Sequence, residues 1–88
     1  MKNFFKVLSQ SEAVNITRQD GSIVTKSTIV LQELGGKFEN SFVCALLGQQ
    51  LTLHPGDFVY AALRFAHREH NGNLYQDITI QEIVKLGE

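Results

Sequence analysis

Positively charged side chains are the residues of this sequence with the clearest chemistry. Eight Lys and Arg stand against nine Asp and Glu, a formal net charge of −1, so no overall positive charge points to nucleic acid. Neutralising phosphates with Lys and Arg, together with stacking on rings, is nevertheless the chemistry that a single nucleic-acid strand requires. The candidates for that chemistry are Arg18, Lys26, Lys37, Arg64, Arg68, His70 and Tyr75. The alternative is that Lys and Arg only decorate exposed strand faces, since acidic residues are interspersed among them.

Metal-binding and catalytic patterns are poorly represented. His67 and His70 are three residues apart, which places them on opposite faces of a strand, and neither a cysteine pair nor a third ligand is evident. Cys44 lies in an apolar segment and is expected to be a small buried hydrophobe. The sequence contains neither a nucleophile elbow nor a phosphate-binding glycine loop. We therefore expect no metal, no cofactor, no small-molecule substrate and no enzymatic activity.

The length and the lack of linkers predict a single domain over residues 1–88. Hydrophobic residues make up 43% of the chain, which is enough for one modest core. One cysteine cannot form an internal disulfide, as is usual in a reducing compartment. No apolar stretch approaches the length of a membrane span, and the N-terminus lacks the pattern of a signal peptide. We expect a cytoplasmic protein that does not enter a membrane.

The elements that would position the charged residues are mostly strands. Segments rich in Val, Ile, Phe, Thr and Tyr favour strands over residues 3–16, 23–34, 37–47, 57–68 and 74–86. Asp20-Gly21, Gly35-Gly36 and Asn71-Gly72 mark turns between them. Residues 47–53 break the alternation, and the spacing of Leu47 and Leu51 favours a short helix between the third and fourth strands.

Alternation along the strands predicts which side chains fill the core. Ile29 and Leu31, and then Val59, Ala61, Leu63 and Phe65, are expected to face inward, with Phe42 and Phe65 as the main core aromatics. Phe58 and Tyr60 then lie outside, where a partner subunit would cover them together with Val43. We therefore expect a homo-oligomer, in the simplest case a homodimer. The alternative is that the alternation is inverted and these rings fill the core.

Five strands with a helix between the third and fourth follow the plan of an OB-fold, a five-stranded Greek-key barrel. An SH3-like barrel is the main competitor. The second half of the chain also resembles the bacterial single-stranded-DNA-binding proteins and their small relatives, including primosomal replication protein N. The segments that carry the resemblance are residues 42–48 (FVCALLG), 53–60 (LHPGDFVY), 63–65 (LRF), 71–75 (NGNLY) and 78–80 (ITI).

The resemblance implies a non-catalytic module that binds single-stranded DNA, or RNA, in replication, repair or mobile-element biology. Ligands of OB-folds lie across the second and third strands between two flanking loops. In the relatives aromatic rings stack on bases, whereas here Leu47 occupies one such position, His70 another, and the chain has no tryptophan. The near-neutral charge and the missing tryptophans leave an alternative open, a protein-interaction module that assembles into a homo- or hetero-oligomer. An oligosaccharide-binding OB-fold is a third possibility.

Overall fold

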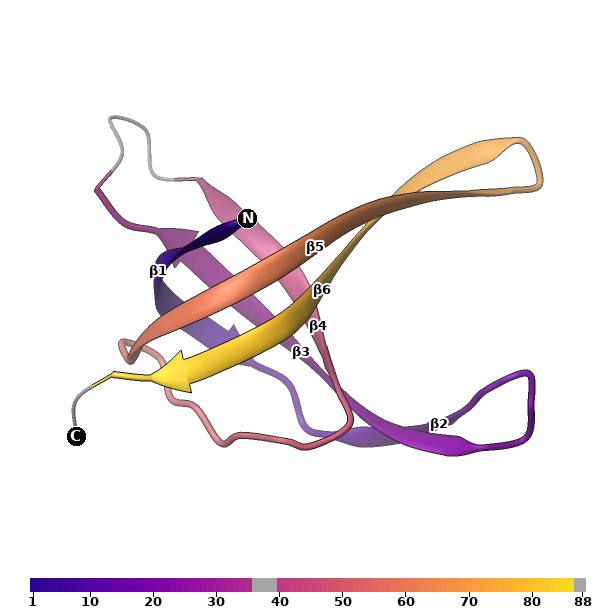
Figure 1. Ribbon diagram of the computed structural model, residues 1–88, viewed down its shortest axis with the longest axis horizontal. Coiled ribbons are helices and arrows are strands. Elements are labelled where there is room, and N and C mark those ends of the chain that lie inside the picture. The colour runs from indigo at the N-terminus through magenta and orange to yellow at the C-terminus, as the bar shows by residue number, and fades with distance from the viewer. Residues whose placement is uncertain (36–39, 87–88) are drawn as a thin grey trace.

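The computed structural model describes residues 1–35 and 40–86, and every regular element in these ranges is a β-strand (Figure 1). The predicted all-β class is therefore confirmed. Among the described residues no helix could cross a membrane. The strands are β1 (Lys2–Gln10), β2 (Val14–Thr17), β3 (Ile23–Glu33), β4 (Ser41–Leu47), β5 (Phe58–His70) and β6 (Asn73–Lys85).

The six strands form one sheet that nearly closes into a ring. The order is β1-β5-β6-β4-β3-β2, and β1 also pairs with β3, which joins the two sides of the sheet. All pairings are antiparallel except that of β4 with β6, which is parallel and has a single register pair, Ala45 with Thr79. The β4–β6 junction is therefore the least paired place in the ring, and from it β5–β6 and β2–β3 extend to one side as two long hairpins (Figure 1).

The predicted first strand is divided in two, so the described chain has six strands rather than five. Residues 11–13 separate β1 from β2. At this break Ser11 bonds to Thr28 twice: its N–H donates to the Thr28 carbonyl, and its Oγ accepts from the Thr28 N–H, both at 2.9 Å. The hydroxyl replaces a backbone carbonyl in the ladder, which lets the chain turn away from the ring while its hydrogen bonds remain satisfied.

The short helix predicted over residues 47–53 is absent, and this prediction was wrong. Gly48 adopts φ 84°, and side chains from elsewhere hold the segment. The Gln10 amide donates to the Leu51 carbonyl at 2.8 Å and accepts from the Leu53 N–H at 2.7 Å. Leu53, rather than Leu47, reaches the core. So short a segment has little helical stability of its own, and these distant hydrogen bonds determine its path.

The core lies inside the ring and is built from the inward faces of five strands and Leu53. Ile29, Leu31, Val59, Ala61 and Leu63 are buried as predicted. The other members of the core cluster are Phe5, Val7, Cys44, Leu46, Leu53 and Ile80.

The two aromatic residues expected in the core are less buried than predicted. Phe42 only packs against the cluster, and Phe65 is 43% exposed. Phe65 lies where β5 leaves the ring, so its ring meets Phe42 edge-on at 5.9 Å and otherwise faces solvent.

Candidate functional site

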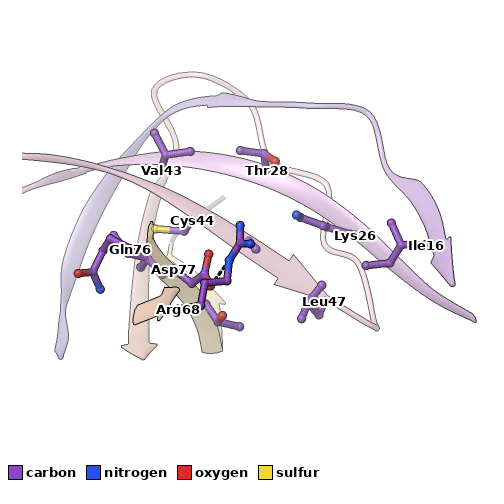
Figure 2. A pocket seen from close by; sticks show the side chains of 12 residues that line it. Ile16, Lys26, Thr28, Val43, Cys44, Leu47, Arg68, Gln76 and Asp77 are labelled. Atoms are coloured by element: carbon purple, nitrogen blue, oxygen red, sulfur yellow. Dashed lines mark hydrogen bonds and ion pairs between the residues drawn. The ribbon is translucent and has the colours of Figure 1, made fainter. Parts of the chain in front are cut away.

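A groove opens beside the β4–β6 junction, between the bases of the two hairpins (Figure 2). Its volume is about 470 Å³. Four strands and the end of β5 contribute to its lining, which consists of Ile16, Lys26, Thr28, Val43, Cys44, Ala45, Leu47, Arg68, Gln76, Asp77, Ile78 and Thr79. The groove thus gathers residues up to 63 positions apart (16 to 79), because the sparse pairing of β4 with β6 leaves room between the strands.

Strand register explains why outward side chains share this surface. Partners in register point to the same face of a sheet. Thr28 pairs with Ala45, and Ala45 with Thr79, so these three form a row across the groove. Arg64 is the partner of Thr79 on the next strand, which puts it at the end of that row, beside the groove rather than in its lining.

Arg68 is the best-positioned cation of the site. Its Nε donates to Asp77 Oδ2 at 2.9 Å, and its guanidinium lies 4.9 Å from the centre of the Tyr75 ring. The ion pair uses Nε, so the terminal amino groups can still donate to a ligand. Both partners are well exposed, and the pair therefore contributes little to stability. Its effect is to hold a flat cation and a ring together at the groove.

Lys26 supplies the second cation, near the base of the β2–β3 hairpin. It is half-buried and pairs in register with Leu47 on one side and Val14 on the other. Figure 2 shows Lys26, Leu47 and Ile16 together at one end of the groove, with Val43 at the other. Three apolar members of the lining, Ile16, Val43 and Leu47, remain exposed to solvent, so the groove combines two cations with an apolar floor.

The other predicted binding residues are placed around the groove or away from it. Arg18 lies in the turn between β2 and β3, where its N–H donates to the Ser22 carbonyl at 2.8 Å. His70 is at the tip of the β5–β6 hairpin, paired with Asn73. Lys37 lies outside the described residues.

Of the three predicted interface residues, Phe58 and Tyr60 lie on β5 on the outside of the ring, whereas Val43 lines the groove.

Asp77 and Gln76 are residues of the groove that the sequence analysis missed. A signal for them existed, because a two-residue Asn-Gly turn sets the register of its hairpin. That register places Arg68 opposite Tyr75 and Ala66 opposite Asp77, so Asp77 is the diagonal neighbour of Arg68. Ile16 and Leu47 carried no such signal, since their place depends on where β2 diverges from the ring.

Cys44 is the cysteine of the groove lining. Burial raises the pKa of the Cys44 thiol to about 11, so it is neutral at physiological pH and unsuited to attack. His67 and His70 oppose Gln76 and Asn73 rather than one another. Within residues 1–35 and 40–86 no three His, Cys, Asp or Glu side chains come together to hold a metal ion. The arrangement offers two cations, a ring beside one of them and apolar side chains to a ligand.

The comparisons with known proteins found nothing similar to this chain. No family model, no curated protein and no solved structure matches it.

Proposed function

We propose that this chain is a non-catalytic OB-fold module that binds single-stranded nucleic acid along the groove, with DNA rather than RNA as the preferred ligand. The observation that carries the proposal is the groove itself, where Lys26 and the Arg68–Tyr75 stack flank an apolar floor. The setting that we propose is replication, repair or mobile-element transfer in the cytoplasm of a bacterial cell.

The strand arrangement supports an OB-fold. The ring β1-β3-β4-β6-β5 has five strands, and β2 with the start of β3 forms the hairpin that extends beyond it. OB-folds bind across their second and third strands, between the loop that precedes the second strand and a hairpin near the end of the chain. The groove has this position, with β3 and β4 beneath it and the two hairpins beside it.

The groove chemistry supports a strand with exposed bases rather than a duplex. Base stacking on a side chain contributes about 1–3 kcal/mol per base, and the flat Arg68 guanidinium, which lies over the Tyr75 ring, offers one such platform in the groove. Val43 and Leu47 offer apolar contact to further bases, while Lys26 and Arg68 can neutralise phosphates. Asp77 offsets part of the charge, so we expect affinity in the micromolar range and a steep dependence on salt.

Fluorescence anisotropy of a labelled oligo-dT, titrated with protein at low salt, tests the proposal. Binding should weaken as salt rises, with a log–log slope of about −0.7 for each phosphate contact, and Arg68→Ala should both weaken binding and flatten the slope. Lys85→Ala is the matched control, because Lys85 lies at the end of β6, opposite Val59 and outside the groove lining. A chain that does not bind at tens of micromolar would contradict the proposal, and an oligo-U strand in the same assay distinguishes RNA from DNA.

A second candidate function is a protein-interaction module. The observation that favours it is a pair of exposed aromatic side chains, Phe4 on β1 and Phe58 on β5, neither of which lines the groove. Isolated exposed hydrophobes are common, but a contiguous apolar surface is typical of an interface.

A further inference from the structure

The outward side of β1, β5 and β6 carries an apolar surface with a regular layout. Phe4 pairs with Tyr60, and Tyr60 with Val84, so these three form a row across the strands; Phe58 lies in the next row. Phe4, Phe58 and Val84 are each about half exposed, at 50%, 48% and 49%. The rings of Phe4 and Tyr60 meet edge-on with centroids 5.2 Å apart. We call Phe4, Phe58, Tyr60 and Val84 the aromatic face.

Charged residues of opposite sign flank the aromatic face on its two sides. Lys2 pairs with Ala62, and Ala62 with Glu82, which places Lys2 on the β1 side and Glu82 on the β6 side of the same row. Lys6 adds a second cation on the β1 side, opposite Phe58. None of the three forms an ion pair with another described residue. The surface is thus basic along one edge, apolar in the middle and acidic at the opposite edge.

We propose that a second copy of this chain covers the aromatic face. The two copies are related by a two-fold axis that lies between their sheets and runs parallel to β5. Such an axis exchanges the β1 side with the β6 side. Phe4 then packs on the partner's Val84, and Lys2 meets the partner's Glu82 on both sides of the interface. A two-fold axis across the strands would instead place Lys2 against the partner's Lys6. Charge therefore selects the first arrangement, in which two sheets pack face to face with aligned strands.

The size of the aromatic face predicts how strong the dimer is. Three strands about 4.8 Å apart and three rows of alternate residues span roughly 15 by 20 Å. That is less than the about 800 Å² per partner of a standard stable interface. We therefore expect a reversible dimer with a dissociation constant in the micromolar range.

Dimerisation through this surface leaves the groove free. The aromatic face and the groove lining share no residue, so each dimer would present two grooves. Two linked sites strengthen binding to a ligand long enough to reach both. The dimer does not depend on the proposed function, because the surface that forms it lies outside the groove.

Sedimentation velocity over protein concentrations from about 1 to 500 µM, without nucleic acid, tests the dimer. The wild type should shift from monomer to dimer within this range. Glu82→Lys and Lys2→Glu should each raise the dissociation constant about tenfold, since each places like charges together twice. Combining both changes should restore the wild-type value. Glu69→Lys is the control for net charge, because Glu69 lies on the hairpin opposite Leu74.

Two outcomes would overturn the inference. One is a wild-type chain that remains monomeric throughout the concentration range. The other is a dimer that the double variant fails to restore, which would exclude the axis along β5. Circular dichroism of each variant separates loss of the dimer from loss of the fold. Since oligo-dT is absent, failure here leaves the groove proposal standing, and failure of oligo-dT binding leaves the dimer standing.

Discussion

At the scale of single residues, the groove depends on a cation that is held in place by an anion. Asp77 fixes the Arg68 guanidinium over Tyr75, and the same carboxylate would repel a phosphate. Orientation and charge therefore act in opposite directions at one residue. The ion pair is exposed, so its effect on folding is small and its effect on binding can be measured separately.

Asp77→Asn should tighten oligo-dT binding. The amide keeps a hydrogen-bond acceptor for Arg68 but removes the negative charge, so affinity should rise about three- to tenfold at low salt. Anisotropy titration measures the change, and Glu69→Gln on the same hairpin removes an equal charge outside the groove lining. Equal gains in both variants would mean that net charge, rather than the groove, determines binding.

Cys44 should be inert in the folded protein. Burial raises its pKa from 9.0 to about 11, so the folded state favours the neutral thiol. The neutral thiol's contribution to the free energy of unfolding is complete below pH 9, and it is lost as the pH rises through about 11. An aromatic disulfide reagent at pH 8 should react only as fast as the chain opens, and urea should accelerate the reaction. Immediate reaction of the native protein would show that the groove exposes the thiol.

At the scale of elements, the strands were predictable and the segment between β4 and β5 was not. Alternation identified the cores of β3, β4 and β5 because each has one buried face. The helix predicted from the spacing of Leu47 and Leu51 is absent, because Gln10 and Gln50 set the path of residues 48–53 through hydrogen bonds across the fold. No local pattern encodes contacts over 40 residues, such as that of Gln10 with Leu51.

Gln50→Ala should destabilise the fold by about 1–3 kcal/mol. The Gln50 amide donates to the carbonyls of Thr25, Leu46 and Gly48. It also accepts from the hydroxyl of buried Ser27 at 2.6 Å. Truncation would leave that hydroxyl with one weak contact, from Gln10 at 3.5 Å.

Urea denaturation measures this loss, and the neighbouring Gln49 is the matched control. Gln49 is exposed and makes no hydrogen bond to another described residue, so Gln49→Ala should change the free energy of unfolding by less than about 0.5 kcal/mol. Similar losses in the two variants would mean that the hydrogen bonds of Gln50 do not hold residues 48–53 in place.

At the scale of the whole molecule, stability and binding reside in different parts. Every buried residue lies in or against the ring, whereas residues 64–77 include none that is fully buried. The ring closes through β1–β3, β1–β5 and the single β4–β6 pair. Composition and alternation predicted such a core, but the outward projection of the two hairpins depends on where pairing ends, which no single segment reveals.

Shortening the β5–β6 hairpin should therefore remove binding and spare the fold. Deleting residues 67–70 and 73–76 joins Ala66 and Asp77, which are already paired, through the native Asn71-Gly72 turn. The variant loses Arg68 and Tyr75 but no member of the core cluster, so its thermal midpoint should remain close to that of the wild type. Its affinity for oligo-dT should fall at least about tenfold, since one base-stacking platform and one cation are gone.

The aromatic face is untouched, and sedimentation should still report the dimer. Undiminished binding would place the ligand elsewhere on the ring, whereas loss of the fold would show that the hairpin stabilises the β4–β6 junction.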